Sequence, residues 1–380
     1  MQYNDKNTLS LCSKLVLVVT GGIGRNIMGT AVVRALKKAW PKKDIVVMAG
    51  CPEVFGKNPN IQRVHNMGRP SYIYEDYFQK NKSMVMSVEP YQHLEYTLRT
   101  KHFIDCWCDL LGIEPAGIEP EVYYNLSEVE MAKDYLSKFD KPMVLFQHQG
   151  GKVPEEPNKK ARLIAKSGMY KRNLPENVAQ QVTDGLIERG YMVGSVGHPN
   201  QFLPKGAEQV KFPIRAIVAL VPHVAGVLTI DSFLLHASAC YKGVTPTVAL
   251  WGGTNPQVLG YPWHRNIVRQ VCDTPMCHRP NSYLWDFEES GFLWDCPHND
   301  ICMNYKAEDI LKEFDIAMEK EKPNDSRKSE SDGRKSEGRW SEEANAKCPE
   351  SKDKSCGKEG VPCNGKGELT EKISANSRAN

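Results

Sequence analysis

Short apolar runs alternate along the chain with longer segments in which apolar residues recur every three or four positions. Residues 14–20 and 44–50 are of the first kind, and residues 25–40 between them are of the second kind, ended by Pro41. Short runs rich in β-branched residues are typical of strands buried on both faces, and the longer spacing is typical of amphipathic helices. The beginning of the chain is therefore predicted to form a β-α-β unit.

The same alternation continues to residue 322, interrupted by a proline- and glycine-rich segment at 114–121. Further strands are expected at 84–88, 143–148, 191–196, 226–230 and 245–251, and helices at 94–111, 127–139, 176–189, 214–221, 233–240 and 306–322. Two β-α series separated by a linker predict an α/β fold of two doubly wound, Rossmann-like domains, residues 1–140 and 141–322. Residues 323–380 contain few aliphatic side chains and are predicted to be a disordered tail.

A glycine-rich turn, Gly21-Gly22-Ile23-Gly24, joins the first predicted strand to its helix. A dinucleotide fingerprint requires a further glycine where Ile27 stands, and a Walker A loop requires lysine and a hydroxyl residue where Thr30-Ala31 stand. Both sites are therefore excluded. The turn is either purely structural or an acceptor or phosphate loop made by Gly22, Gly24 and Arg25.

Residues 225–262 contain the most informative pattern in the chain. A predicted strand ends at Asp231-Ser232, which begin a helix, and the next strand ends at Gly252-Gly253-Thr254. Carboxyl ends of neighbouring parallel strands share one edge of the sheet, where open α/β sheets bind ligands. His236 lies within the helix and either reaches the same edge or is a core histidine. The helix start favours an anion such as a phosphate.

This stretch resembles glycosyltransferase family 9, the ADP-heptose:lipopolysaccharide heptosyltransferases. The matching residues are Asp231-Ser232-x-x-x-His236 and Pro246-x-Val248-x-Leu250-Trp251-Gly252-x-Thr254-x-Pro256, with Phe233 where the family has glycine. The resemblance implies a GT-B fold, with the two domains facing each other across a cleft. It also implies sugar transfer from a nucleotide-diphosphate donor, an ADP-sugar being favoured, to a hydroxyl of a glycan or glycolipid. Neither a cofactor nor a metal is implied.

The family resemblance also implies roles for single residues. Asp231 would hold hydroxyls of the donor sugar, or it could simply cap the helix. Lys171, matched to the lysine of the family's Lys-x-Trp-Pro pattern, would pair with the diphosphate, although such a lysine can equally be solvated. His236 and the backbone N–H groups of Ser232 and Phe233 would offset charge on the leaving diphosphate. The donor-binding set is completed by Gly252, Gly253 and Thr254.

One departure from the family concerns the catalytic base. The family has aspartate after the first glycine turn, where this chain has Arg25, and a guanidinium cannot accept a proton. Glu89 and His93 are candidate replacement bases or ordinary surface residues. The departure keeps two alternatives open: a sugar- or nucleotide-binding protein without turnover, and a nucleotide-sugar epimerase.

Composition limits the partners and the cellular location that we expect for the protein. The 380 residues carry a formal net charge of +3, which does not indicate a nucleic-acid partner, and no apolar run is long enough for a membrane span. At most peripheral membrane contact is expected. The first residues lack the pattern of a signal peptide, so a cytoplasmic location is predicted. Cys272, Cys277, Cys296 and Cys302 lie in a tryptophan-rich segment at 272–302 and could bind zinc or remain free thiols.

Overall fold

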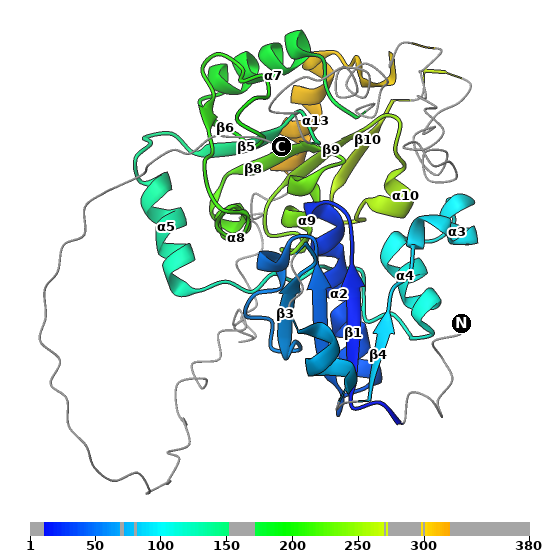
Figure 1. Ribbon diagram of the computed structural model, residues 1–380. Helices are drawn as coiled ribbons and strands as arrows, with labels where there is room; N and C mark the ends of the chain where they lie inside the picture. Colours follow the sequence, from blue (N-terminus) through cyan, green and yellow to red (C-terminus); the bar gives the residue numbers. More distant parts are fainter. Residues whose placement is uncertain are drawn as a thin grey trace, which may run out of the picture. The chain divides into compact units, whose positions relative to one another are not determined.

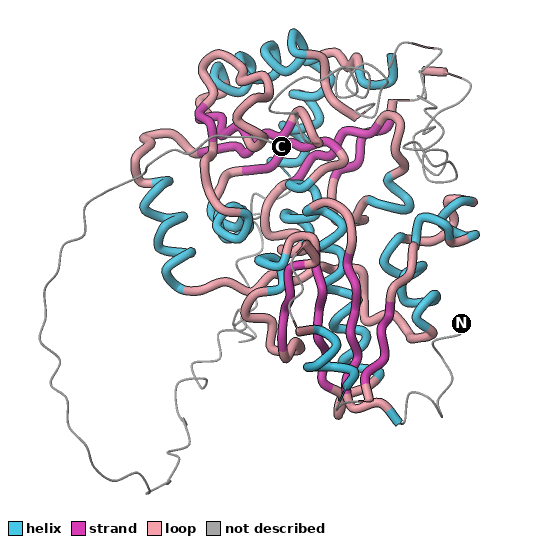
Figure 2. The backbone as a smooth tube through the Cα atoms, in the orientation of Figure 1, coloured by secondary structure: helices cyan, strands magenta, loops and turns pink. Residues whose placement is uncertain are grey.

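The fold contains two separate parallel sheets. It is seen in a computed structural model that describes residues 11–68, 72–79, 82–151, 172–269, 271–272, 298 and 301–319. The predicted tail at 323–380, Lys171, Cys277 and Cys296 lie outside the described residues. Figure 1 shows the two sheets with their helices, and Figure 2 shows the same path coloured by type of structure.

The first sheet has four parallel strands in the order β3-β2-β1-β4. Its half of the chain runs β1 (Lys14–Val19), α2 (Ile23–Ala39), β2 (Asp44–Ala49), η1 (Pro52–Phe55), β3 (Arg63–Asn66), η2 (Glu75–Gln79), β4 (Ser83–Met86), η3 (Pro90–Gln92), α3 (Leu94–Thr97), α4 (Phe103–Leu111) and α5 (Leu126–Leu136). The β-α-β unit predicted at the start of the chain is present.

The second sheet has six parallel strands in the order β10-β9-β8-β5-β6-β7. Its elements are β5 (Met143–Gln147), α7 (Glu176–Glu188), β6 (Met192–Ser195), β7 (Glu208–Gln209), α8 (Ile214–Leu220), η4 (Val221–His223), β8 (Gly226–Ile230), α9 (Phe233–Ala239), β9 (Thr247–Trp251), α10 (Pro256–Leu259), β10 (Arg265–Val268), η5 (Ile301–Met303) and α13 (Ala307–Glu319). This is the strand order of a complete doubly wound sheet.

Alternate residues of each strand enter different cores, because successive side chains point to opposite faces of a sheet. In β5, Leu145 belongs to a core shared with the first sheet, whereas Val144 and Phe146 pack in the core that contains α7 and α13. The shared core runs from the helices of one sheet to those of the other. The chain up to Pro323 forms one compact unit, within which a domain boundary near residue 140 stays a prediction.

One helix departs from the sequence prediction. The helix expected over 94–111 is broken into α3 and α4, because Arg99 adopts a positive φ of 62° and the imidazole Nδ1 of His102 caps α4 by accepting from the N–H of Ile104. Helix α5, which the boundary assigns to the first domain, packs against α8 through an ion pair between Arg215 and Glu128 at 2.6 Å.

Candidate functional site

The turning point of the second sheet lies between β5 and β8. From β5 the chain builds outwards to β6 and β7 on one side, and then to β8, β9 and β10 on the other. Open α/β sheets bind ligands at the carboxyl ends of the two strands that flank this point. Gly150 follows β5 and Ser232 follows β8, and a Cβ placed on Gly150 would lie 2.7 Å from the Ser232 Oγ. Both strand ends therefore meet at one place.

Asp231 lies at this place, only 4% exposed. Its Oδ2 is 3.7 Å from Nη1 of Arg172, whose Nε is buried without a hydrogen-bond partner among the described residues. The neighbouring Asn173 accepts from the N–H of Gly150 at 2.9 Å, which fastens the Arg172 segment to the loop after β5. A guanidinium with donors to spare beside a buried carboxylate can hold an anion and a hydroxyl side by side.

The basic residue placed here is thus Arg172, which the sequence analysis did not single out. Lys171, its neighbour, lies outside the described residues, so its role stays a prediction. The sequence nevertheless contains a pattern that indicates Arg172. Counted back from Pro175, the Lys-x-Trp-Pro pattern puts its basic residue at 172, with Leu174 in the place of tryptophan.

Two more polar atoms at this edge are buried without partners among the described residues. They are Oγ1 of Thr254, after β9, and Nδ1 of His148, after β5. An unsatisfied buried polar group costs about 1–3 kcal/mol, so a ligand that bonds these atoms would be stabilised accordingly. Thr254 thus lies where the sequence analysis expected it.

Helix α9 begins at this edge without the capping that the sequence suggested. Ser232 is the N-cap residue, but its side chain makes no capping hydrogen bond. Instead Oε1 of Gln147 accepts from the N–H of Leu234 at 2.8 Å. Among the described residues the Ser232 hydroxyl is thus not used to cap α9, and Gln147 is a positioning residue that the sequence did not reveal.

His236 is a buried, neutral residue of α9. Its Nδ1 is 2.9 Å from the hydroxyl of Tyr261, and burial lowers the pKa of His236 to about 4 although the charge of Asp231 opposes the shift. A neutral imidazole can act on a diphosphate as a hydrogen-bond donor but supplies no positive charge. The interpretation as a core histidine is supported by this burial, and a ligand contact stays a prediction.

The remaining donor-binding candidates pack against protein. Phe233 is 9% exposed and belongs to the shared core, and Gly253 is buried. A Cβ on Gly252 would lie 2.3 Å from Sδ of Met303 and 3.0 Å from Sγ of Cys302. Glycine at 252 therefore allows η5 to pack closely on β9. Contact of these residues with a donor stays a prediction.

The turning point of the first sheet lies between β1 and β4, and the glycine turn occupies it. Gly22 is the exposed N-cap residue of α2, whereas Gly24 and Arg25 already belong to the first turn of this helix. Nη1 of Arg25 donates to both carboxylate oxygens of Glu89, at 3.1 and 2.8 Å. The anion that Arg25 holds is therefore a side chain that follows β4.

The two predicted loops converge at Gly24 and His236. A Cβ on Gly24 would lie 2.6 Å from Cδ2 and 3.1 Å from Nε2 of His236, closer than a real Cβ permits, and α2 packs along α9. The N-terminal turn of α2 therefore touches α9, the helix that follows Asp231. Asn26 secures this turn by donating to the carbonyls of Gly21 and Gly22 while accepting from the N–H of Cys51.

We expect Gly24→Ala to destabilise the protein by about 1–3 kcal/mol, because the added methyl overpacks the contact with His236. His236→Ala in the same chain should remove the clash, so the two changes should be non-additive by at least about 0.5 kcal/mol. Urea unfolding of both single variants and the double variant measures this coupling. Additive changes would mean that α2 and α9 do not touch at these residues.

Two of the four cysteines of the segment 272–302 lie among the described residues. Cys302 is buried beneath Gly252 and Cys272 is half-buried, whereas Cys277 and Cys296 lie outside the described residues. Zinc binding by these thiols stays a prediction. Within the described part, His93, Glu95 and Asp109 are grouped closely enough to suggest a metal site, but the ammonium of Lys101 bonds both carboxylates, at 2.8 and 2.6 Å.

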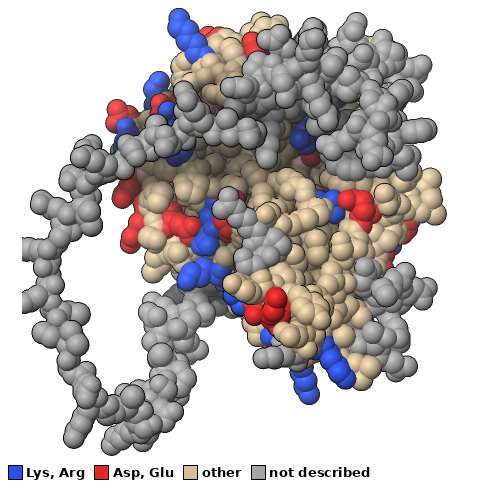
Figure 3. All heavy atoms as spheres, viewed as in Figure 1, with Lys and Arg blue, Asp and Glu red and all other residues tan. Residues whose placement is uncertain are grey.

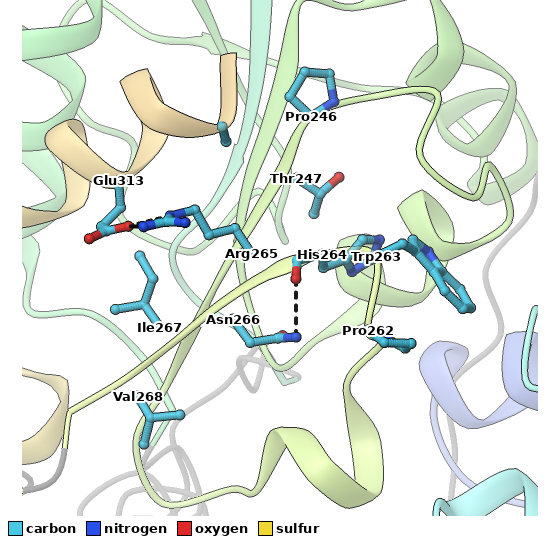
Figure 4. Close-up of a pocket in the computed structure, with 11 residues that line it drawn as sticks. Pro246, Thr247, Pro262, Trp263, His264, Arg265, Asn266, Ile267, Val268 and Glu313 are labelled. Atoms are coloured by element: carbon cyan, nitrogen blue, oxygen red, sulfur yellow. Dashed lines mark hydrogen bonds and ion pairs between the residues drawn. The ribbon is translucent and has the colours of Figure 1, made fainter. Parts of the chain in front are cut away.

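A pocket of about 580 Å³ lies elsewhere, at the amino ends of β9 and β10 beside α13. Figure 4 shows Arg265 paired with Glu313 on one side and Trp263 on the other. None of the predicted site residues that the structure describes lines it. We favour the carboxyl edge as the site, because it combines the turning point of the sheet with buried, unpartnered polar atoms.

Surface properties add little to the choice of partner. On the face seen in Figure 3, the cationic and anionic side chains of the described residues are interspersed, so this face offers no single-sign surface of the kind that attracts a polyanion. Among the described helices, none is both long and apolar enough to cross a bilayer.

No family model matches the sequence, and no curated protein matches it either. Solved structures do match. A glycosyl transferase family 9 structure from Veillonella parvula gives a TM-score of 0.57 at 16% identity over 84% of this chain and 99% of its own. ADP-heptose lps heptosyltransferase II of E. coli gives 0.55 at 15% identity over 81% and 99%. The iron-containing dodecameric glycosyltransferase TibC of enterotoxigenic E. coli gives 0.56 at 16% identity over 81% and 76%.

These neighbours agree with the resemblance that the Asp231–His236 and Pro246–Pro256 motifs carry. At this level of identity the likeness establishes the fold, a parallel-sheet α/β arrangement with two sheets.

Proposed function

We propose that this protein is a glycosyltransferase that moves a sugar from a nucleotide-diphosphate donor, with an ADP-sugar favoured, to a hydroxyl of a glycan or glycolipid. The observation that carries the proposal is the buried Asp231 beside Arg172, at the turning point of the second sheet. Support comes from the fold, whose solved neighbours include glycosyltransferases and an ADP-heptose lps heptosyltransferase.

In the proposed reaction the acceptor oxygen bonds to the anomeric carbon while the bond from that carbon to the phosphate oxygen breaks. The electron pair leaves on the nucleoside diphosphate. Arg172, with Lys171 beside it in the sequence, would stabilise this charge in place of a divalent metal, which makes the reaction metal-independent. Asp231 would accept hydrogen bonds from the sugar hydroxyls, and the hydroxyls of Ser232 and Thr254 would complete the donor site. The acceptor would approach from the side of the first sheet.

A panel of ADP-, UDP- and GDP-sugars tests this proposal. We expect one class of donor to raise the melting temperature and to release nucleoside diphosphate on incubation. Arg172→Gln should weaken binding of that donor by about 10–100-fold, since a charge-assisted hydrogen bond is worth about 1.5–3 kcal/mol. Arg189→Gln is the matched control, because Arg189 also pairs with an aspartate, Asp315 at 3.0 Å, on the helices α7 and α13.

Other results of the donor panel would indicate a different function. Tight binding without any product favours a sugar- or nucleotide-binding protein, and an isomerised donor favours an epimerase. Equal donor binding by Arg172→Gln and Arg189→Gln would refute the assigned site.

A further inference from the structure

Two charged side chains occupy the turning point of the first sheet. Arg25 lies in the first turn of α2, which follows β1, and Glu89 follows β4, the strand beside β1. Their ion pair joins Nη1 of Arg25 to both oxygens of Glu89, and Nη2 of Arg25 also lies 3.4 Å from the carbonyl of Val88. A ligand that approaches this edge of the sheet would meet the pair.

Arg25 is held in place by its surroundings, although its buried Nε has no hydrogen-bond partner among the described residues. Its side chain is 7% exposed, and its guanidinium lies over the rings of Tyr91, Phe103 and Trp107 at 5.5, 5.9 and 5.2 Å from their centroids. Contacts of this kind fix the plane and position of a guanidinium. The effect of Arg25 is therefore to hold the carboxylate of Glu89 in one place.

Glu89 keeps a carboxylate oxygen open to a ligand. Its Oε1 accepts from Arg25 and from the backbone N–H of Tyr91 at 3.2 Å, whereas Oε2 accepts from Arg25 alone among the described residues. The side chain of Glu89 is 34% exposed. A carboxylate oxygen accepts from more than one donor, so Oε2 can take a hydrogen bond from a hydroxyl.

The open carboxylate lies on the side of the first sheet that touches the proposed donor site. Gly24, next to Arg25, contacts His236 of α9. A second connection runs through His102, the residue before Phe103. The ring of His102 lies 5.6 Å from the ring of Tyr261, and the hydroxyl of Tyr261 is hydrogen-bonded to His236. Glu89 is thus joined to α9 by two short chains of contacts.

The other candidate base does not have this freedom. Nδ1 of His93 accepts from the N–H of Glu95 at 3.2 Å and caps α3, while its Nε2 faces Asp109 at 3.7 Å. Both ring nitrogens therefore have protein partners.

We propose that Glu89 is the general base of the transfer reaction. Its Oε2 accepts the proton of the acceptor hydroxyl as that oxygen bonds to the anomeric carbon and the nucleoside diphosphate departs. Arg25, although it cannot accept a proton, positions the carboxylate that does. This inference rests on the proposed transferase function and assigns the general base, a role that Arg25 cannot fill.

The decisive variants separate the chemistry from the ion pair. Glu89→Gln should lower kcat by about 10²–10⁴-fold, the usual contribution of a general base, with donor binding unchanged. Glu89→Asp keeps the charge but shortens the side chain by one methylene, so this variant should also be slow. The double variant Arg25→Gln/Glu89→Gln removes both charges, so it should regain any stability lost by Glu89→Gln without regaining rate. Glu95→Gln, in the adjacent helix, is the matched control.

Donor turnover and nucleoside diphosphate binding are measured in every variant, with the ADP-sugar that the wild type uses fastest. A Glu89→Gln variant that keeps more than a tenth of the wild-type kcat overturns the assignment. A double variant that returns to the wild-type rate overturns it too, since Glu89 would then serve only to neutralise Arg25. If the wild type turns over no donor, the transferase function itself has failed, and the role of Glu89 fails with it.

Discussion

Replacing Asp231 by alanine is expected to abolish transfer, with a fall in kcat/KM of about 10²–10³-fold or more. Asp231 is 4% exposed at the end of β8, and Arg172 is its ion-pair partner in the described part of the chain. Its loss would remove the proposed acceptor for sugar hydroxyls and leave the Arg172 guanidinium without this partner. Initial rates of nucleoside diphosphate release, measured with the donor that the wild type uses, give the effect.

Asp315→Ala provides the control for Asp231→Ala. Asp315 also pairs with an arginine, but on the surface between α7 and α13, so its loss should change the rate less than about twofold. A fully active Asp231→Ala variant would refute the assignment of the donor site to Asp231.

Acidification is expected to cost the protein about 5–10 kcal/mol of unfolding free energy between pH 7 and pH 4.5. Burial lowers the pKa of His102 and His264 to about 3 and that of His148 and His236 to about 4. In the unfolded chain the pKa of histidine is about 6.5. Below about pH 6.5 these histidines are therefore protonated in the unfolded state while they stay neutral in the folded state. Stability is complete above about pH 6.5 and falls by about 1.4 kcal/mol per pH unit for each histidine below it.

Urea unfolding followed by circular dichroism at pH 7.5, 6.0 and 5.0 measures this loss. His264→Gln should reduce the number of protons taken up on unfolding by up to one, because glutamine does not titrate, and stability should then fall less steeply with pH. Unfolding free energies that stay level from pH 7.5 to 5.0 would show that the histidines are not buried as described.

Most strands were predictable because their side chains are buried on both faces. The run Gly226–Ile230 is β8 to the residue, and Lys14–Thr20 and Asp44–Gly50 contain β1 and β2 with one residue to spare. Uninterrupted apolar runs of this length indicate where a strand buried on both faces begins and ends. The glycine turn and Asp231-Ser232 then fall at strand ends, which explains why the sequence could place these residues at the edges of their sheets.

Contacts between distant segments were not predictable. Spacing reveals neither that Gln147 caps α9, nor that Glu89 pairs with Arg25 across 64 positions, nor that Gly252 touches Met303. The break between α3 and α4 depends on one residue with positive φ, which arginine rarely adopts and composition cannot signal.

A crystal structure with the bound nucleotide-diphosphate sugar decides whether the donor binds between the carboxyl ends of β5 and β8. We expect the diphosphate within hydrogen-bonding distance of Arg172 and a sugar hydroxyl on Asp231. A nucleotide bound instead in the pocket at the amino ends of β9 and β10, with both side chains directed away from it, would rule out this donor site.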